Sequence, residues 1–298
     1  MNRCIYCILL FCLNIVLCSG QKIRDVEASI QYNIDFSPAT TKIRLLSLIP
    51  NDLPGKQRVN SIVFSVEPDT IYFEGNNKFA EFIVTDRENS IIRIDADITF
   101  FRSDYQTLSR SKELELLSDT LDMKKYLQAE TFIDSDHPEI LAIAGRLMGK
   151  DRAKSVRKIY DYVVNTISYS YYIPFPQGSL ITLHSKGGDC SDFSHLMVAI
   201  CRAASIPARS VYGLVYPYSN TSKHDWVEVY FDDIGWVTFE PTSGNNAQFD
   251  RIDKIYLNLF PEGSTKLFDK SFFYRSWYWG SRSPINATYN ISEKKSKR

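Results

Sequence analysis

The hydrophobic period changes along this chain, and the change limits the folds that it can adopt. Apolar residues alternate with polar ones in residues 28–36 and 92–100, and a shorter alternation covers 62–66. A period of two places one face of a strand in a core and the other in water. From about residue 136 the apolar period becomes 3.6, which is typical of amphipathic helices. The chain is therefore expected to begin with strands and continue with helices.

The later part of the chain returns to strands after its helices. Helical stripes cover residues 140–147, 156–167 and 193–203, and strand patterns follow at 209–216, 226–231 and 236–240. Helices followed by an antiparallel sheet indicate an α+β domain, here preceded by an antiparallel β-sandwich. An aromatic cluster at 272–279 is expected to close the α+β core beside its C-terminal strand rather than to bind substrate or carbohydrate. The expected organisation is a signal peptide at 1–20, a β-sandwich at 21–101, a linker at 102–135, the α+β domain at 136–285 and a disordered tail at 286–298.

The first twenty residues have the features of a secretory signal peptide. Arg3 precedes an apolar run over residues 5–17, and small residues at 18–20 offer a cleavage site before Gln21. The apolar run is too short to favour a permanent membrane span. We therefore expect an exported protein (periplasmic, cell-surface or secreted) with no integral membrane span in the mature chain. The alternative is a lipoprotein acylated at Cys18, although Leu17 occupies a position where that processing needs a small residue.

Composition and charge exclude several classes of protein. The chain is 44% hydrophobic and 23% charged, which is typical of a globular protein, and its formal net charge is zero. A nucleic-acid partner is not expected, because proteins that bind nucleic acids usually carry a basic excess. The sequence contains neither a phosphate-binding loop nor metal-ligand spacing. No cofactor and no metal are therefore predicted.

Two cysteines remain after the signal peptide, Cys190 and Cys201. On one helix, eleven residues would separate them by about 16 Å, too far for a disulfide. Cys190 follows Gly187 and Gly188 at the start of a helix, where the helix dipole favours a thiolate and the first N–H groups can stabilise an oxyanion. A buried structural cysteine is the alternative for each, and Cys201, among apolar neighbours, fits that interpretation.

A reactive thiol needs a base, and the chain has four histidines. His137 and His184 lie in loop-like segments, and His195 lies on another side of the helix that begins at Cys190. His224 opens a strand, and Glu240 ends the next one. Nucleophile, base and orienting carboxylate are the parts of a catalytic triad.

The hairpin between these two strands decides whether the base and the carboxylate meet. Residues 233–235 make a three-residue loop with Gly235 in the left-handed position, so that Asp232 pairs with Trp236. His224 and Glu240 then point to the same face of the sheet, whereas a slip of one residue would separate them.

Two segments resemble the transglutaminase-like superfamily. They are GGDCSDFSHLMVAICRAASIPARSVYG at 187–213 and HDWVEVYFDDIGWVTFEPT at 224–242. The resemblance is strongest from Ala153 to Thr242. Members of this superfamily share a papain-like fold with a Cys–His–Asp triad. The β-rich segment of this chain looks like the N-terminal domain that often accompanies this core in bacterial members.

The resemblance implies roles for individual residues. Cys190 matches the nucleophile and His224 the base, while Glu240 occupies the position that usually holds Asp. Asp192 matches an acidic residue common in the motif, and we expect it to bond N–H groups at the helix start.

The implied chemistry is acyl transfer from an amide of a peptide or protein substrate to Cys190, which gives a thioester. Hydrolysis by a peptidase or amidase is favoured over protein crosslinking, because microbial relatives of this layout are often regarded as peptidase-like. The alternative is an exported binding or adhesion module that retains the fold without catalysis.

Overall fold

The structure of the chain is a computed structural model that describes residues 22–85, 90–109, 123–170, 177–217, 223–242, 249, 251–261 and 273–294. The predicted signal peptide at 1–20 and part of the predicted linker, 110–122, lie outside these residues. Among the described residues, none of the helices is long and apolar enough to cross a membrane.

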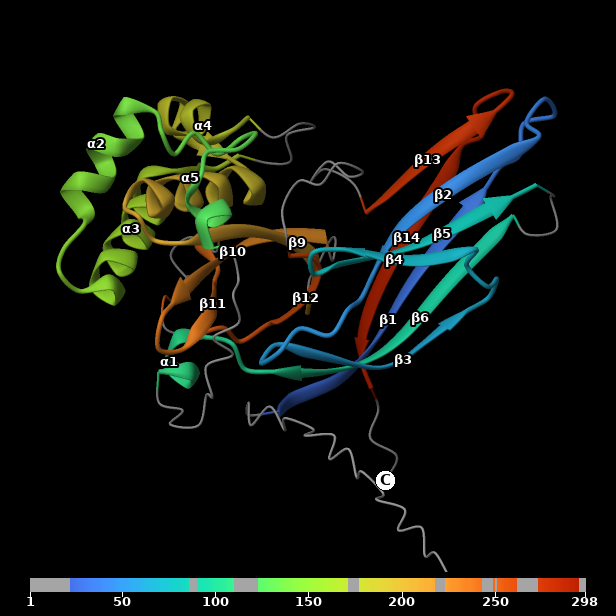
Figure 1. The fold of residues 1–298 in the computed structure, drawn as a ribbon, viewed down its shortest axis with the longest axis horizontal. Helices are drawn as coiled ribbons and strands as arrows, with labels where there is room; N and C mark the ends of the chain where they lie inside the picture. The colour runs from blue at the N-terminus through green and yellow to red at the C-terminus, as the bar shows by residue number, and fades with distance from the viewer. Residues whose placement is uncertain are drawn as a thin grey trace, which may run out of the picture.

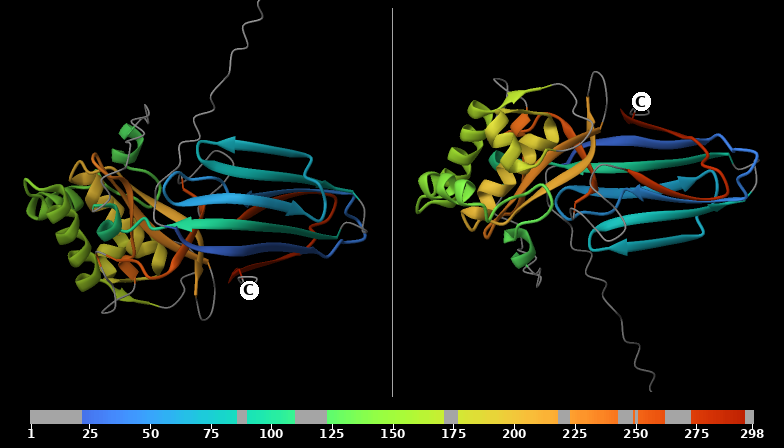
Figure 2. Two further views of the ribbon diagram at one scale, coloured as in Figure 1. Left: turned by 90° about the horizontal axis from the view of Figure 1, so that it is seen from below. Right: turned by 90° about the horizontal axis from the view of Figure 1, so that it is seen from above.

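The N-terminal strands form a sandwich of two antiparallel four-stranded sheets, as predicted, and the last two strands of the chain complete it (Figures 1 and 2). One sheet has the strand order β14-β1-β6-β3 and the other β13-β2-β5-β4. The strands are β1 (Lys22–Ile34), β2 (Lys42–Ile49), β3 (Gln57–Phe64), β4 (Thr70–Glu74), β5 (Asn77–Val84), β6 (Ile91–Phe101), β13 (Tyr274–Trp279) and β14 (Ile285–Glu293).

The end of the chain departs from the prediction. Where a disordered tail from residue 286 is expected, β14 pairs with β1 from Val26↔Glu293 to Ile34↔Ile285. The aromatic cluster also belongs to the sandwich, because β13 pairs with β2 instead of closing the α+β core. The physical reason is a period of two that short polar residues obscure: Tyr289 and Ile291 alternate with Asn and Ser, and both pack on the sandwich core.

The helical part confirms the predicted stripes. Helix α5 is buried along nearly its whole length, and α2, α3 and α4 pack around it (Figure 1). Helix α4 lies in a segment where the sequence gives no helical pattern. The elements are α1 (Tyr105–Leu108), the 3₁₀ helix η1 (Met123–Leu127), α2 (Pro138–Leu147), α3 (Arg152–Thr166), β7 (Ser168–Tyr169), α4 (Ser179–Ser185), β8 (Gly187–Gly188) and α5 (Cys190–Ala203).

A third antiparallel sheet, of order β11-β10-β9-β12, lies between the helices and the sandwich (Figure 1). Its strands are β9 (Ala208–Tyr216), β10 (Lys223–Phe231), β11 (Gly235–Phe239) and β12 (Ile255–Phe260). One face packs on α5 through Val227 and Val229. Farther along β9 and β12, Leu214 and Leu257 join Leu46 of the sandwich in one apolar cluster. The sandwich and the α+β part therefore share a continuous core.

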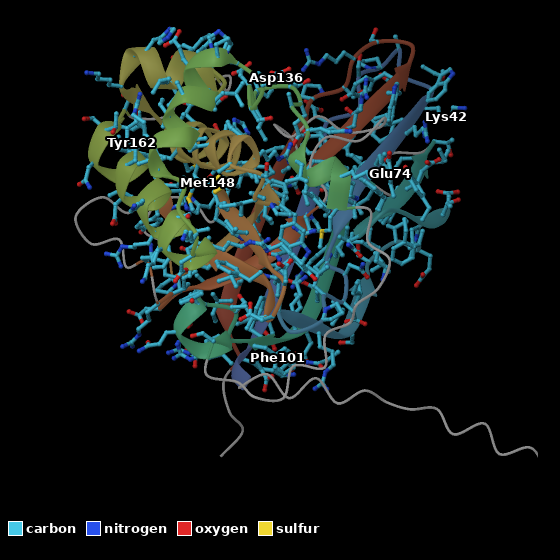
Figure 3. All side chains as sticks on the ribbon, turned by 60° about the vertical axis from the view of Figure 1, so that its left-hand side comes forward. Lys42, Glu74, Phe101, Asp136, Met148 and Tyr162 are labelled. Carbon is cyan, nitrogen blue, oxygen red and sulfur yellow. The ribbon has the colours of Figure 1, made fainter. Side chains whose placement is uncertain are left out.

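The two parts nevertheless keep distinct outer surfaces. Figure 3 shows Met148 and Tyr162 on the helical side of the molecule and Lys42 and Glu74 on the sandwich. The third sheet thus lies between the helices and the sandwich, and α5 packs against β9 and β10 of that sheet.

Candidate active site

Cys190 is the first residue of α5, and its surroundings explain why the helix begins there. Asp189 is the N-cap and accepts a hydrogen bond from Ser191 N at 3.0 Å. A Cβ atom on Gly188 would lie 2.4 Å from Cβ of Asp192, so only glycine fits at this approach. The Cys190 side chain stays partly exposed, whereas Cys201 is fully buried. The two cysteines therefore have the different environments that the sequence predicts.

Asp192 stabilises the helix start, as expected, and does more. Its Oδ2 accepts a hydrogen bond from Asp189 N at 3.1 Å, which completes a capping box. Its Oδ1 accepts a second one from Gln177 N at 2.9 Å. Burial raises the pKa of the Asp192 carboxyl, and the two backbone donors oppose that shift. Asp192 thus fastens the segment before α4 to the start of α5.

The hairpin between β10 and β11 brings His224 and Glu240 to the same face. Tyr230 pairs with Trp236 and Phe231 with Gly235, so the predicted pairing of Asp232 with Trp236 is wrong by two residues. Because side chains alternate between the two faces of a strand, a register shift of two residues leaves each side chain on the face that was predicted. Gly235 has the left-handed conformation that was expected, with a φ of 76°.

Glu240, directly after β11, forms the centre of a buried hydrogen-bond network. Its Oε2 accepts a hydrogen bond from His224 Nε2 at 2.5 Å and another from the Tyr256 hydroxyl at 2.8 Å. Its Oε1 accepts one from Thr242 N at 2.8 Å, and its backbone oxygen accepts one from the Tyr160 hydroxyl at 3.0 Å. The sequence gives no signal for Tyr160 or Tyr256, because both lie outside the two motif segments at 187–213 and 224–242.

Cys190 and His224 are hydrogen-bonded through their side chains. Since His224 Nε2 contacts Glu240, the other ring nitrogen, Nδ1, is assigned to Cys190. The structure therefore joins the three predicted site residues into one chain, in the order Cys190, His224, Glu240. This is the geometry of a nucleophile, a base and an orienting acceptor.

The charges of the three groups depend on one another. Burial lowers the pKa of the His224 imidazole, but the Glu240 carboxylate and the contacts with Cys190 outweigh it and hold the pKa well above 6.5. Burial raises the pKa of Glu240, and the charge and hydrogen bonds of His224 reverse this, so that the pKa lies below 4.5. Glu240 is therefore an ionised acceptor for a protonated imidazole nitrogen.

Opposing influences act on the pKa of the Cys190 thiol. Burial raises its pKa above the ordinary value of 9.0, and the opposing contact with His224 does not cancel that effect. Burial therefore opposes the thiolate that His224 favours.

The three remaining histidines are engaged elsewhere. His137 is the N-cap of α2, where its Nδ1 accepts a hydrogen bond from Glu139 N, and His184 on α4 contacts the Glu139 carboxylate at 2.9 Å. The prediction that both lie in loops is wrong for His184. His195 is buried in α5, with its ring stacked on Phe132 at 5.7 Å. Among the described residues, His, Cys, Asp and Glu side chains form no group of three or more that could hold a metal ion.

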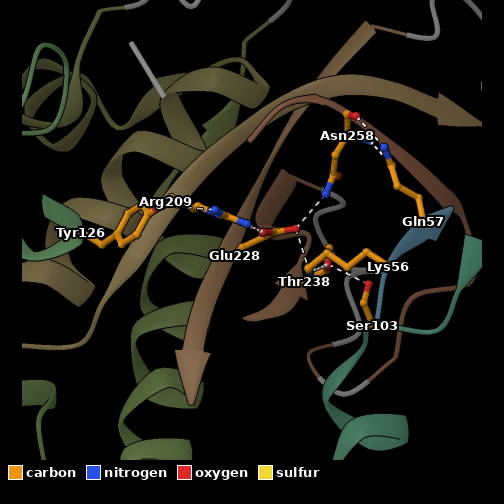
Figure 4. Close-up of polar contacts among 8 residues, drawn as sticks. All are labelled: Lys56, Gln57, Ser103, Tyr126, Arg209, Glu228, Thr238 and Asn258. Carbon is orange, nitrogen blue, oxygen red and sulfur yellow. Dashed lines mark hydrogen bonds and ion pairs between the residues drawn. The ribbon is translucent and has the colours of Figure 1, made fainter. Parts of the chain in front are cut away.

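A second buried polar cluster surrounds Glu228, which lies on the same strand as His224 (Figure 4). Glu228 has no exposed surface and pairs with Lys56 Nζ at 2.8 Å and Arg209 Nη2 at 2.7 Å, while Asn258 Nδ2 donates to it at 3.2 Å. Burial raises the pKa of Glu228, but the two cations outweigh it and lower the pKa to about 2. Because Lys56 belongs to the sandwich, the cluster connects the sandwich to β10.

Comparison with known families and structures shows what this chain is similar to. Residues 142–241 match the model of the transglutaminase-like superfamily. The fold resembles the crystal structure of a candidate cysteine protease from Cytophaga hutchinsonii, with a TM-score of 0.62 and 17% identity over 92% of this chain and 91% of that one. At this identity the likeness describes the fold alone.

Two curated proteins match shorter segments. The uncharacterized protein YebA of Bacillus subtilis is 45% identical over 85 residues, which are 23% of this chain and 12% of YebA. An uncharacterized protein of Mycobacterium leprae is 31% identical over 84 residues, 24% of this chain and 29% of that protein. The matched segments thus span less than a third of either relative.

Proposed function

We propose that this protein is a thiol enzyme that acts on amide bonds of peptides or proteins, because residues 142–241 match the model of the transglutaminase-like superfamily. The observation that supports the proposal is the hydrogen-bonded chain from Cys190 through His224 to Glu240. Each group has the neighbour that its role requires: the nucleophile contacts the base, and the base contacts an ionised carboxylate.

The proposed reaction begins when the Cys190 sulfur attacks the carbonyl carbon of an amide and its proton passes to His224. The first-turn N–H groups of α5 and the helix dipole favour the oxyanion that forms. When the C–N bond breaks, His224 returns the proton to the leaving amine, and a thioester remains on Cys190. A water molecule then attacks the thioester, the C–S bond breaks, and the thiol is regenerated with a carboxylic acid as product.

We favour hydrolysis by a peptidase or amidase over transfer of the acyl group to an amine. The same three residues serve either outcome, which depends on whether water or an amine reaches the thioester. The name of the Cytophaga hutchinsonii protein, a candidate cysteine protease, agrees with hydrolysis. We further propose that the signal at 1–20 exports the protein, which would place its substrates outside the cytoplasm.

Turnover by the mature chain, residues 21–298, tests the proposal. A fluorogenic peptide mixture reports hydrolysis, and incorporation of a labelled primary amine into casein reports transfer. We expect hydrolysis by the native protein and none by Cys190→Ala, with Cys201→Ala as the matched cysteine control. If the native chain and Cys190→Ala are equally inactive on both substrates, the binding-module alternative is favoured. Retained activity in Cys190→Ala would exclude the assigned nucleophile.

A further inference from the structure

Tyr256 reaches the candidate active site from the far edge of the third sheet. It lies on β12, at one edge of the order β11-β10-β9-β12, while Glu240 directly follows β11 at the other edge. Its hydroxyl nevertheless donates to Glu240 Oε2 at 2.8 Å. Adjacent strands are spaced by about 4.8 Å, so the side chains of Tyr256 and Glu240 must extend toward each other over the two inner strands.

Packing fixes the direction of the Tyr256 ring. The ring lies edge-to-face on Trp226, with centroids 5.0 Å apart and an interplanar angle of 70°. Gly213 on β9 allows β12 to approach, because a Cβ atom there would lie 1.9 Å from Leu257 O and 2.8 Å from the Trp226 ring. A side chain at Gly213 would displace the residue that follows Tyr256. The hydroxyl is therefore directed at Glu240 by the close packing of three strands.

Glu240 needs such support because glutamate has one more rotatable bond than aspartate. Oε2 accepts from both His224 and Tyr256, and Oε1 accepts from Thr242 N. Two donors on one oxygen and a third on the other leave the carboxylate a single orientation. Hydrogen bonds to an ionised group are about twice as strong as neutral ones.

We propose that Tyr256 is a positioning residue of the Cys190–His224–Glu240 site, whose hydroxyl fixes the Glu240 carboxylate against the His224 imidazole. The inference rests on the proposed function, because it assigns Tyr256 a role in that chemistry. Tyr256 does not contact the reacting atoms. Its hydroxyl also lowers the proton affinity of Oε2, which keeps the shared proton on His224 Nε2.

Tyr256→Phe tests the inference, since it removes the hydroxyl and keeps the ring on Trp226. We expect kcat to fall by about tenfold to a hundredfold with KM unchanged, which matches the loss of one hydrogen bond to a charged group. The acid limb of the pH profile should move to higher pH, because the carboxylate loses a donor that favours its ionised form. In a Glu240→Ala background, Tyr256→Phe should have no further effect on kcat.

Alkylation of Cys190 by iodoacetamide, followed across pH by peptide mapping, gives the same profile without a substrate. Tyr160→Phe is the matched control, because its hydroxyl bonds the backbone oxygen of Glu240 and not the carboxylate; its pH profile should stay in place. A Tyr256→Phe profile identical to the native one, with only a lower melting temperature, would overturn the inference. Absence of turnover in the native enzyme would instead count against the proposed function, while the alkylation profile would still decide the role of Tyr256.

Discussion

Lys56, directly before β3 of the sandwich, forms an ion pair with Glu228 on β10 of the α+β part, with Nζ and Oε1 2.8 Å apart. The two side chains are 9% and 0% exposed. Glu228 lies four residues beyond His224 on the same face of the same strand, since side chains alternate along β10. Lys56 of the sandwich therefore pairs with the buried Glu228 charge on the strand that holds the candidate base His224.

We predict that Lys56→Met destabilises the whole chain. Removal of one partner from a buried ion pair costs about 3 kcal/mol, because the other charge stays buried with fewer partners. Arg209 remains beside Glu228 and limits the loss. Chemical denaturation measures the change. Arg24→Met, which breaks the exposed pair with Glu293, is the control and should cost less than about 1 kcal/mol. Equal losses in the two variants would contradict the prediction.

The same pair predicts how stability depends on pH. The pKa of Glu228 falls from an ordinary 4.5 to about 2 in the folded chain. A lowered carboxyl pKa stabilises the fold above pH 4.5, and this contribution is lost as the pH falls from 4.5 to about 2. In Lys56→Met the pKa of Glu228 rises toward its ordinary value, and the acid-dependent loss should shrink. Unfolding free energies at a series of acidic pH values measure both slopes; parallel slopes would contradict the assignment.

Glu240 gives a prediction about the departure from the usual aspartate. Glu240→Gln should lower kcat/KM by about 10²-fold or more, because an amide cannot balance the imidazolium charge. Glu240→Asp should lower it by about tenfold, since a shorter side chain cannot contact His224, Thr242 and Tyr256 together. A thermal melt controls for unfolding. If Glu240→Asp equals or exceeds the native enzyme, the site is not built around glutamate.

The two cysteines should differ in their reaction with a limiting thiol reagent. Cys190 is partly exposed and contacts His224, whereas Cys201 is fully buried and burial raises its pKa to about 12. We expect iodoacetamide to label Cys190 well before Cys201 in the native protein. Mass spectrometry of the peptides measures the order, and His224→Ala should slow labelling at Cys190 alone. Equal labelling of both cysteines would contradict the assigned site.

A chain that ends at Pro284 should be less stable and should aggregate. It lacks β14, so β1 becomes an open edge strand and Phe273 loses the Tyr289 ring at 4.8 Å. We expect a loss of about 3–5 kcal/mol from the apolar packing of β14. Denaturation and size-exclusion chromatography test this against a chain that ends at Lys294, which keeps the whole strand. Equal melting temperatures would show that β14 adds nothing.

The site could be predicted from the sequence where its residues lie in one continuous pattern. Cys190 follows two glycines and precedes an apolar stripe, and the hairpin fixes the parity of His224 and Glu240 even though its register is wrong by two residues. Tyr256 could not be found in this way, because its contact with Glu240 depends on how closely β12 approaches β9. No local pattern specifies that distance.

The fold shows the same division. Strands with one solvent-exposed face, such as β6, show a clear alternation of apolar and polar residues and were predicted. Strand β2 gives none, because both of its faces are apolar: Leu46 and Leu48 pack in one cluster and Ile43 and Leu45 in another. The pairing of β14 with β1 joins residues more than 250 positions apart, and no local pattern encodes it.

The pairing of β1 with β14 also sets an order for assembly during synthesis. Ribosomes add about 5–20 residues each second, so β1 emerges long before the strand that completes its sheet. Until then the sandwich has two incomplete sheets, since β2 likewise awaits β13. The segment that contains Cys190 and His224 emerges after the first six strands and before β13 and β14. The sandwich beside it is therefore still incomplete at that time. Completion of the two sandwich sheets is therefore a late event, although β1 and β2 can pair early with β6 and β5. Until then, the unpaired edge of β1 is the surface that a chaperone would have to protect.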